Sequence, residues 1–479
     1  MFEPGKSAPW YKSRTVFIAL CVVVGLAVAV GVALFISSRS QSNEDHYAAL
    51  EQHRQQQAAQ APAPVAAATA SPVASASPGA SPTETAAPAP VATGRNYWTN
   101  FRGPKRDGNY EATPVLTSWP SGGLSPVWKQ PVGVGYASFT VADGRAYTIE
   151  QRRGEEVVVA YDVSTGREVW TQAWNALYSD STGDGPRATP TWDNGRIYAL
   201  GATGELRCLD ANTGAVIWGK NILSDNQARN LQWAMAASPL VVDDKVIVLP
   251  GGTSGKSVVA YNKNTGAPVW KVLNDTQAYV SPMLVELAGR RQIMVVSSSR
   301  VVGLVPESGA VLWSYAWDTS SGINVSQPIV VDKNRFFISS GYGKGAALVE
   351  VQGSGNSFTA TTIWENINMK NKFNSSVLHN GHVYGLDEGI LTCLDVNTGE
   401  RKWKGGRYGY GQVLLASGHL ILTSDTGDLA LVKATPDQYT EVARFQALSG
   451  QTWNYPAIAD GRLLVRNANE MAAYDISRK

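Results

Sequence analysis

The sequence predicts an all-β protein, an eight-bladed β-propeller in which each blade is a four-stranded antiparallel sheet. Three observations lead to this fold class. A short pattern that ends in tryptophan recurs along the chain, a hairpin-like pattern recurs before it, and each end of the repeat region carries the half of the pattern that the other end lacks. With 44% hydrophobic and only 17% charged residues among 479, the chain can also bury a large core.

The recurring pattern is clearest between Ala160 and Trp170. It consists of an apolar segment that leads to Asp162, then Thr165-Gly166, and finally Trp170. An Asp side chain can bond the backbone of a turn, and a Gly can adopt the positive φ that closes a short loop. The unit is therefore strand, tight turn, strand. A small residue precedes the Trp by ten positions and leaves room for an indole ring. We expect docking contacts at Trp128, Trp170, Trp218, Trp270, Trp313 and Trp403.

A second hairpin pattern occurs eight times and precedes the tryptophan pattern where both are present. Two hairpins make a four-stranded sheet of about 40 to 50 residues, which is the period of a propeller blade. The eight hairpins begin at Phe139, Pro190, Pro239, Pro282, Pro328, Ser376, Val413 and Pro456.

The two ends of the repeat region complement each other. Trp128 has no small residue and turn ahead of it, whereas Ala473-Tyr474-Asp475 has no Trp after it. Pairing the Trp128 strand with the last blade, as its outermost strand, completes that blade and leaves no open edge. The sequence therefore predicts a ring that is closed by its N-terminal strand.

The segment before the propeller has three parts. Residues 1–14 carry an excess of positive charge, and the apolar run 15–36 is long enough to cross a bilayer as a signal anchor. Residues 37–95 are an Ala/Pro/Ser-rich linker that we expect to be disordered, except for a short helix between Asp45 and Gln60. The expected location is the inner (cytoplasmic) membrane with a single span, the propeller of residues 96–479 facing the periplasm or the outside of the cell.

Several function classes have little support. The net charge is only +2 and no basic stripe is interleaved with aromatic residues, which argues against a nucleic-acid partner. Cys208 and Cys393 occupy the small position of the repeat, and the histidines have no metal-ligand spacing. The Gly-rich run 251–256 leads into a strand rather than a helix, unlike a phosphate-binding loop. We assign no catalytic residue and no metal ligand.

Candidate binding residues lie in the loops that lead from the outer strand of one blade to the inner strand of the next. Such loops converge near the central channel of a propeller, and aromatic side chains, Arg and Asn provide flat anchors and forked donors. The alternative is that these residues plug the channel, and that Asp184 and Arg187 pair with each other. The candidates are Tyr136, Asp184, Arg187, Trp233, Tyr279, Asn324, Asn374, Tyr410 and Trp453, followed by Tyr455.

The Ala-x-Asp-x-x-Thr-Gly-x-x-x-Trp pattern resembles the tryptophan-docking repeat of the pyrroloquinoline quinone (PQQ) type β-propellers, over roughly Trp98 to Ser477. This family includes periplasmic quinoprotein alcohol dehydrogenases, which use PQQ with calcium and an adjacent Cys-Cys disulfide. It also includes an outer-membrane assembly lipoprotein, which works as a scaffold without a cofactor. The chain has no adjacent cysteines. It also has an expected membrane anchor and a long linker where the assembly lipoprotein has a lipidated cysteine.

The resemblance implies two functions for the propeller. The first is a monomeric, non-catalytic scaffold that binds envelope proteins through its inter-blade loops and holds no cofactor. The alternative is a quinoprotein oxidoreductase with PQQ and calcium, for which Glu150 and Asp184 are the carboxylates to inspect and Asn324 and Asn374 the amides. A third function, binding of sugar or peptidoglycan by the aromatic residues, has no specific motif.

Overall fold

The computed structural model describes residues 17–18, 43–59, 97–252, 254–355 and 357–478. The chain divides into two compact units, residues 1–55 and residues 56–479. Residues 43–59 are helical, close to the helix expected between Asp45 and Gln60. The predicted membrane span 15–36 lies outside the described residues except for Phe17 and Ile18, and no helix in the described ranges is long and apolar enough to cross a membrane.

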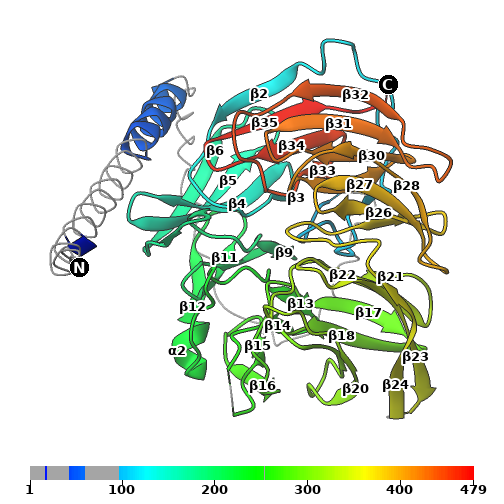
Figure 1. Cartoon of the computed structure of the whole chain (residues 1–479). Helices are drawn as coiled ribbons and strands as arrows, with labels where there is room; N and C mark the ends of the chain where they lie inside the picture. Colours follow the sequence, from blue (N-terminus) through cyan, green and yellow to red (C-terminus); the bar gives the residue numbers. More distant parts are fainter. Residues whose placement is uncertain (1–16, 19–42, 60–96, 253, 356, 479) are drawn as a thin grey trace, which may run out of the picture. The chain divides into compact units, whose positions relative to one another are not determined.

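The fold prediction is confirmed, because the second unit contains eight four-stranded antiparallel blades arranged in a ring (Figure 1). In seven of the eight blades the strands are hydrogen-bonded in chain order, and in the remaining blade the outermost strand comes from the start of the propeller. First strands contact one another in several pairs of neighbouring blades, which places them around the central channel. We number the blades 1 to 8 from the N-terminal side.

The strands of blades 1 to 4 are as follows. Blade 1 contains β3 (Thr140–Ala142), β4 (Arg145–Arg152), β5 (Glu155–Asp162) and β6 (Glu168–Asn175). Blade 2 contains β9 (Thr191–Asp193), β10 (Arg196–Leu200), β11 (Glu205–Asp210) and β12 (Val216–Asn221). Blade 3 contains β13 (Leu240–Val242), β14 (Lys245–Val248), β15 (Val258–Asn262) and β16 (Pro268–Val272). Blade 4 contains β17 (Met283–Leu287), β18 (Arg290–Val296), β19 (Arg300–Leu304) and β20 (Val311–Ala316).

Blades 5 to 8 complete the ring. Blade 5 contains β21 (Ile329–Val330), β22 (Arg335–Ser340), β23 (Gly345–Ser354) and β24 (Ser357–Asn366). Blade 6 contains β25 (Val377–His379), β26 (His382–Asp387), β27 (Ile390–Asp395) and β28 (Arg401–Arg407). Blade 7 contains β29 (Gln412–Ala416), β30 (His419–Thr423), β31 (Asp428–Lys433) and β32 (Glu441–Gln446). Blade 8 contains β33 (Ala457–Ala459), β34 (Arg462–Arg466), β35 (Glu470–Asp475) and the early strand β2 (Pro126–Pro131).

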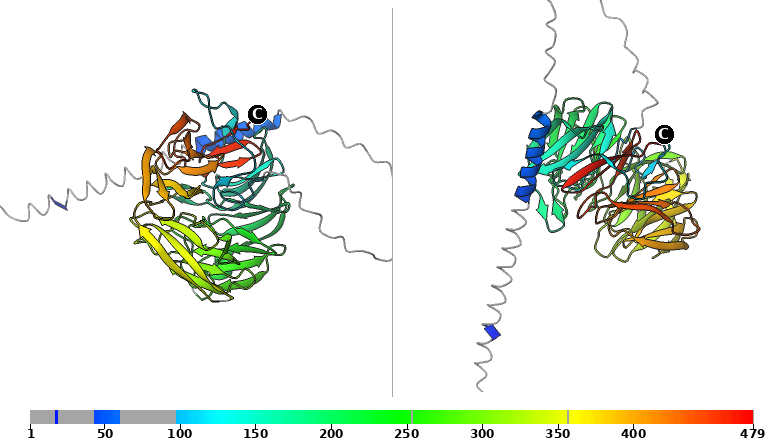
Figure 2. Two further views of the ribbon diagram at one scale, coloured as in Figure 1. Left: turned by 90° about the vertical axis from the view of Figure 1, so that its right-hand side faces the viewer. Right: turned by 90° about the horizontal axis from the view of Figure 1, so that it is seen from above.

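The ring closes as the two ends of the repeat region predict. β2 pairs antiparallel with β35, and Trp128 lies opposite Ala473 in that pair. In Figure 1 and in the turned views of Figure 2, cyan strand β2 from the start of the propeller lies beside red strands from its end. The last blade is therefore built from both ends of the propeller, which ties them together.

Tryptophans join neighbouring blades. Trp170 lies opposite Ala160 in its own blade, and its indole N–H donates to the carbonyl of Ala211 in the next blade at 3.0 Å. The same donation to the next blade is made by Trp128, Trp218, Trp270, Trp364 and Trp403. Trp313 differs, because its indole bonds Gln292 of its own blade.

A series of hydrogen bonds from backbone N–H groups to side chains links blades 1 to 6, two residues before their first strands. In blade 1 the Ser138 backbone N–H donates to Thr189 Oγ1, and the Thr189 N–H donates to Ser238 Oγ, both at 2.9 Å. The series continues from Ser238 to Ser281, from Ser281 to Gln327 and from Gln327 to Ser375. We call this the waist ring.

The lead-in segment 97–110 occupies the channel. Trp98 forms an antiparallel bridge to Val141 of β3, and β1 (Asn109–Tyr110) pairs in parallel with β29. Since all first strands run the same way, the segment enters and leaves by the same face. Between these two points lies Arg106, whose buried guanidinium donates to the carbonyls of Ser238 (3.1 Å) and Pro282 (2.9 Å) and also to that of Pro239.

Candidate functional site

The candidate site is a funnel on one face of the propeller. In a four-stranded antiparallel blade, the loops between strands 2 and 3 and the loops that lead to the next blade emerge on one face, which we call the loop face. The hairpin turns between strands 1 and 2 and between strands 3 and 4 emerge on the opposite face, the turn face. The loop face is where the sequence places its candidate residues.

The funnel is a cavity of about 180 Å³ at the centre of the loop face. Its floor includes Phe101 of the lead-in segment and Tyr455, whose rings meet edge to face with centroids 4.9 Å apart. Its lining is mainly aromatic and aliphatic and consists of Phe101, Tyr136, Thr182, Arg187, Trp233, Ala236, Tyr279, Ile323, Val325, Phe373, Trp453 and Tyr455.

Six of the ten candidates therefore meet in one cavity: Tyr136, Arg187, Trp233, Tyr279, Trp453 and Tyr455. The Tyr136 and Trp453 rings stack, with centroids 5.6 Å apart, and the Trp233 and Tyr279 rings form a second pair at 5.6 Å. Aromatic pairs at this separation add to the stability gained by burial alone. The funnel walls are thus made of side chains that already support one another.

Arg187 is the one charged residue in the lining, and its partner is not the one that the sequence indicated. Its guanidinium donates to Asp180 at 2.8 Å and also to the carbonyls of Gly183 and Gly185, whereas Asp184 accepts from Ser179 Oγ at 2.7 Å. The short hairpin of β7 (Ser179–Asp180) and β8 (Gly183–Asp184) brings Asp180, rather than Asp184, to the guanidinium.

The electrostatics of this hairpin are internally balanced. Burial opposes ionisation of Asp180, but hydrogen bonds from Thr182 and the positive charge of Arg187 together lower its pKa. The Arg187 guanidinium also lies over the rings of Tyr178 and Tyr136, at 4.6 and 5.4 Å from their centroids. The charge of Arg187 is thus neutralised by a neighbour and covered by aromatic rings.

The hydroxyl groups of the lining also have partners within the protein. Tyr136 donates its hydroxyl to the carbonyl of Thr182, and Tyr455 donates its own to Ser375 Oγ at 2.9 Å. The Tyr279 hydroxyl accepts the backbone N–H of Trp233 at 3.4 Å. Thr182 donates both its N–H and its hydroxyl to Asp180 at 2.6 Å. The funnel therefore presents mainly apolar surface.

Lys372 borders the funnel next to Phe373. Its ammonium donates to the Tyr410 hydroxyl at 3.2 Å and lies 4.9 to 5.4 Å from the ring centroids of Tyr342, Phe373 and Tyr410. In the part of the chain that the structure describes, its contacts are this hydroxyl and the three rings, and none is a carboxylate. Tyr410 itself packs its ring against Phe373, at 5.0 Å, and Trp453, at 6.2 Å.

The structure does not bring Asn324 or Asn374 into the funnel, because both side chains are 1% exposed. Asn324 donates to the carbonyls of Ser297 and Trp317 and accepts from Ser340. Asn374 accepts from Asn371 at 2.9 Å. In both loops the funnel is lined by a neighbouring apolar residue instead.

Glu150 is also buried away from the funnel. It is fully buried in an ion pair with Arg152 at 2.6 Å, and it accepts from the Tyr161 hydroxyl at 3.2 Å. Arg152 also pairs with Glu168. This network occupies the oxygens that a bound cation would need.

The described residues contain no cluster of three or more His, Cys, Asp or Glu that could hold a metal ion. Burial raises the pKa of the Cys208 thiol to about 11 and that of Cys393 to about 12. Since the thiolate is the reactive form, neither cysteine is prepared for nucleophilic chemistry.

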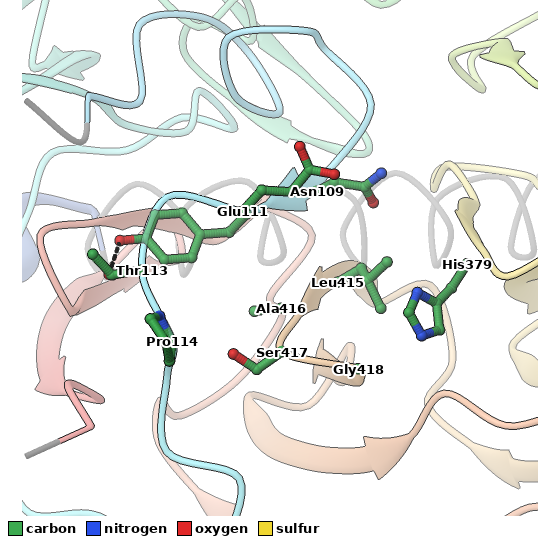
Figure 3. A pocket seen from close by; sticks show the side chains of 10 residues that line it. Asn109, Glu111, Thr113, Pro114, His379, Leu415, Ala416, Ser417 and Gly418 are labelled. Carbon is green, nitrogen blue, oxygen red and sulfur yellow. Dashed lines mark hydrogen bonds between the residues drawn. The ribbon is translucent and has the colours of Figure 1, made fainter. Parts of the chain in front are cut away.

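A second cavity of about 310 Å³ lies at the turn face, between the end of the lead-in segment and the turns of blades 6 and 7 (Figure 3). Glu111, His379 and Ser417 are its principal polar residues. Glu111 forms an ion pair with Lys105 at 2.9 Å, and burial lowers the pKa of His379, which disfavours its charged form. This open cavity lacks the converging aromatic walls of the funnel.

Comparison with known proteins connects the chain with two groups. The family described as "Outer membrane protein assembly factor BamB" matches residues 154–405. Among individual relatives, BamB of Yersinia pestis is 23% identical over 285 residues, which cover 55% of this chain and 68% of that protein. The quinoprotein ethanol dehydrogenase of Pseudomonas aeruginosa is 34% identical over 101 residues, which cover 21% of this chain and only 16% of the enzyme.

Solved structures show the same two groups at the level of the fold. BamB from Moraxella catarrhalis superposes with a TM-score of 0.53 at 18% identity, over 74% of this chain and 100% of that protein. Quinohemoprotein alcohol dehydrogenase from Comamonas testosteroni superposes with a TM-score of 0.56 at 14% identity, over 80% of this chain and 81% of the enzyme.

Proposed function

The chain belongs to the PQQ-like repeat β-propeller family described as outer membrane protein assembly factor BamB, and from this membership we propose that it is a non-catalytic scaffold that binds envelope proteins through its loop face. In this proposal residues 1–14 are cytoplasmic, residues 15–36 anchor the chain in the inner membrane, and residues 37–95 link the anchor to the propeller of residues 96–479. The propeller then works in the periplasm or outside the cell.

One observation carries the proposal: the funnel where the loops converge is walled by aromatic and aliphatic side chains, and the donors of its Arg187, Tyr136 and Tyr455 are bonded to other parts of the protein. Aromatic and Arg side chains in a desolvated centre are typical of the parts of interfaces that contribute most binding energy. Chemistry on a substrate instead requires titratable groups that can reach it. The loop face is better suited to contact than to catalysis.

The alternative is a quinoprotein oxidoreductase, which requires PQQ and calcium. PQQ is a planar quinone that carries several carboxylate groups, and the funnel offers them Arg187, whose charge is balanced by Asp180, and the single ammonium of Lys372 at its rim. Calcium takes about 6 to 8 oxygen ligands. The side-chain oxygens of Glu150, Asn324 and Asn374 are buried and already accept hydrogen bonds from the protein. The residues of the loop face do not fit this cofactor.

Site-specific photo-crosslinking in cells tests the scaffold. We expect benzoylphenylalanine at Gln232 or Leu177, both exposed on the loop face, to give crosslinks to defined envelope proteins. The same probe at Glu307, exposed on a hairpin turn of the turn face, is the matched control. Crosslinks only from Glu307 would contradict the proposal.

Calorimetric titration of the full chain with PQQ and calcium tests the alternative. We expect no saturable binding. Binding of one PQQ per chain that is lost in Trp233→Ala, with the melting transition preserved, would replace the scaffold by the oxidoreductase.

A further inference from the structure

We infer that the funnel receives one large apolar side chain, preferably aromatic, from the partner protein, and that a carboxylate next to that side chain pairs with Lys372. This inference rests on the proposed function and specifies the chemistry of its partner. It concerns the funnel of about 180 Å³ lined by side chains from the inter-blade loops and from the lead-in segment.

The size of the funnel favours a side chain over a free ligand. Pockets for cofactors and drug-sized molecules measure about 300 to 1,000 Å³, whereas the funnel measures about 180 Å³. A partner that anchors itself by one residue needs only such a small, central pocket, with the surrounding loops excluding water from its edge.

The chemistry of the walls selects an apolar group. A buried polar group that finds no partner loses about 1 to 3 kcal/mol. The donors of Tyr136, Tyr455 and Arg187 are already bonded within the protein. A sugar would bring several hydroxyl groups, more than the indole N–H groups of Trp233 and Trp453 can satisfy, so the funnel disfavours it. An aromatic ring can pack against Trp233, Tyr279 and Trp453 without that loss.

The funnel is held in shape before any partner binds. Its floor residue Phe101 adjoins Arg102, which donates to the carbonyls of Asp107 and Ser376 at 2.9 and 2.8 Å and lies 5.2 Å from the Tyr455 ring centroid. The wall residue Trp453 packs on Tyr136 and Phe373. A preformed pocket binds more tightly because fewer side chains lose freedom on binding.

Lys372 gives the rim its charge preference. Its ammonium lies near the Phe373 ring at the edge of the funnel, and its contacts among the described residues are a hydroxyl and aromatic rings rather than a carboxylate. Arg187, the cation of the lining itself, is already paired. A partner that places Asp or Glu beside its anchor residue therefore gains an interaction, and a partner that places Lys or Arg there meets repulsion.

Capped tetrapeptides serve as probes: acetyl-Gly-Asp-Trp-Gly-amide, its Lys-Trp form and its Asp-Ala form. With the full chain, we expect saturation-transfer NMR to show contact through the indole protons of the Asp-Trp peptide. The Asp-Ala peptide should bind at least about 10-fold more weakly. The Lys-Trp peptide should bind about 2- to 5-fold more weakly, and Lys372→Met should abolish this difference while indole binding persists.

Two variants fill the funnel from different loops, Ala236→Trp and Val325→Trp, and Leu177→Trp is the control because Leu177 is 65% exposed outside the lining. In a filled variant that keeps its melting transition, the affinity for the Asp-Trp peptide should fall about 10-fold or more. The affinity of Leu177→Trp for this peptide should not change. Equal binding of Asp-Ala and Asp-Trp, or no effect of filling, would overturn the inference. So would binding of N-acetylglucosamine that filling abolishes.

The outcome also separates the two proposals. If no peptide binds but loop-face crosslinks to envelope proteins form, the side-chain inference is wrong and the scaffold stands. If crosslinks arise only from the turn face and no peptide binds, both are wrong.

Discussion

Two glycines with the same φ angle allow a test of how tightly neighbouring blades pack. Gly266 and Gly289 both adopt φ +69° in hairpin turns. A Cβ added at Gly266 would lie 2.8 Å from Cε3 and 2.9 Å from Cδ2 of Trp218, which belongs to the preceding blade. A Cβ added at Gly289 would meet no heavy atom within 4 Å. Replacing each by Ala therefore places an L-residue at the same positive φ, with a collision at Gly266 and without one at Gly289.

The difference in cost follows from these contacts. A left-handed conformation costs an L-residue about 1 to 2 kcal/mol, and this is all that we expect Gly289→Ala to lose. Gly266→Ala should lose about 1 to 3 kcal/mol more, the cost of an overpacked core. Trp218 cannot easily yield, because its indole N–H donates to the Lys263 carbonyl at 2.9 Å and the side chain lies opposite Cys208.

Equilibrium urea unfolding, followed by tryptophan fluorescence and circular dichroism, compares the two variants. We expect Gly266→Ala to have the lower midpoint, with an unchanged dependence on urea concentration. In a Trp218→Ala background the extra loss should disappear, because the collision has been removed. Equal losses for the two glycines in the otherwise unchanged protein would refute docking of Trp218 on the turn of the next blade.

Three further predictions concern buried groups. In a Cys21→Ser chain, Cys208 and Cys393 should resist alkylation at pH 8 and react once urea unfolds the propeller, since burial raises both thiol pKa values. Burial also raises the pKa of Glu156, so the folded protein binds a proton at this carboxylate more tightly than the unfolded chain does. Lowering the pH from 7 to 5 should therefore stabilise the protein relative to Glu156→Gln, as measured by urea unfolding. Arg106→Met should lose about 2 to 4 kcal/mol, because it leaves buried carbonyls without donors, and should speed proteolysis of the lead-in segment.

Much of the fold could be predicted because its signals are local and repeat. A hairpin followed by a turn of fixed length gives the same spacing in most blades, and the incomplete ends can only complete each other. Blade 5 escapes this reasoning at one point. Its strands β23 and β24 form a long hairpin without the Thr-Gly turn, so the spacing of the repeat does not identify Trp364 as a docking tryptophan. The Trp364 indole nevertheless donates to the Val396 carbonyl of the next blade.

The candidate site was harder to predict because alternate residues of an extended chain point to opposite sides. The sequence reasoning selected Asn324 and Asn374 for their amides, but the funnel is lined by Ile323, Val325 and Phe373 beside them. Phe101 was missed because the lead-in segment is not a repeat, so no equivalent position in another blade indicates where it lies. The Ser/Thr/Gln-Pro pairs before several first strands, at Thr189, Ser238, Ser281 and Gln327, are a sequence signal for the waist ring.

The contacts that hold the ring explain why one propeller fold can serve either chemistry or binding. The waist ring and the docked tryptophans join the blades, and most of the loop face takes no part in them. The loops are therefore free to differ, and function depends on whether their carboxylates keep unshared oxygens. Here Asp180 is bound by Arg187, and Glu156 by the Ala202 N–H at 2.6 Å and the Trp174 indole at 2.9 Å. Both carboxylates already accept hydrogen bonds from the protein itself. The centre of the loop face is therefore a mainly apolar cavity that a partner can fill.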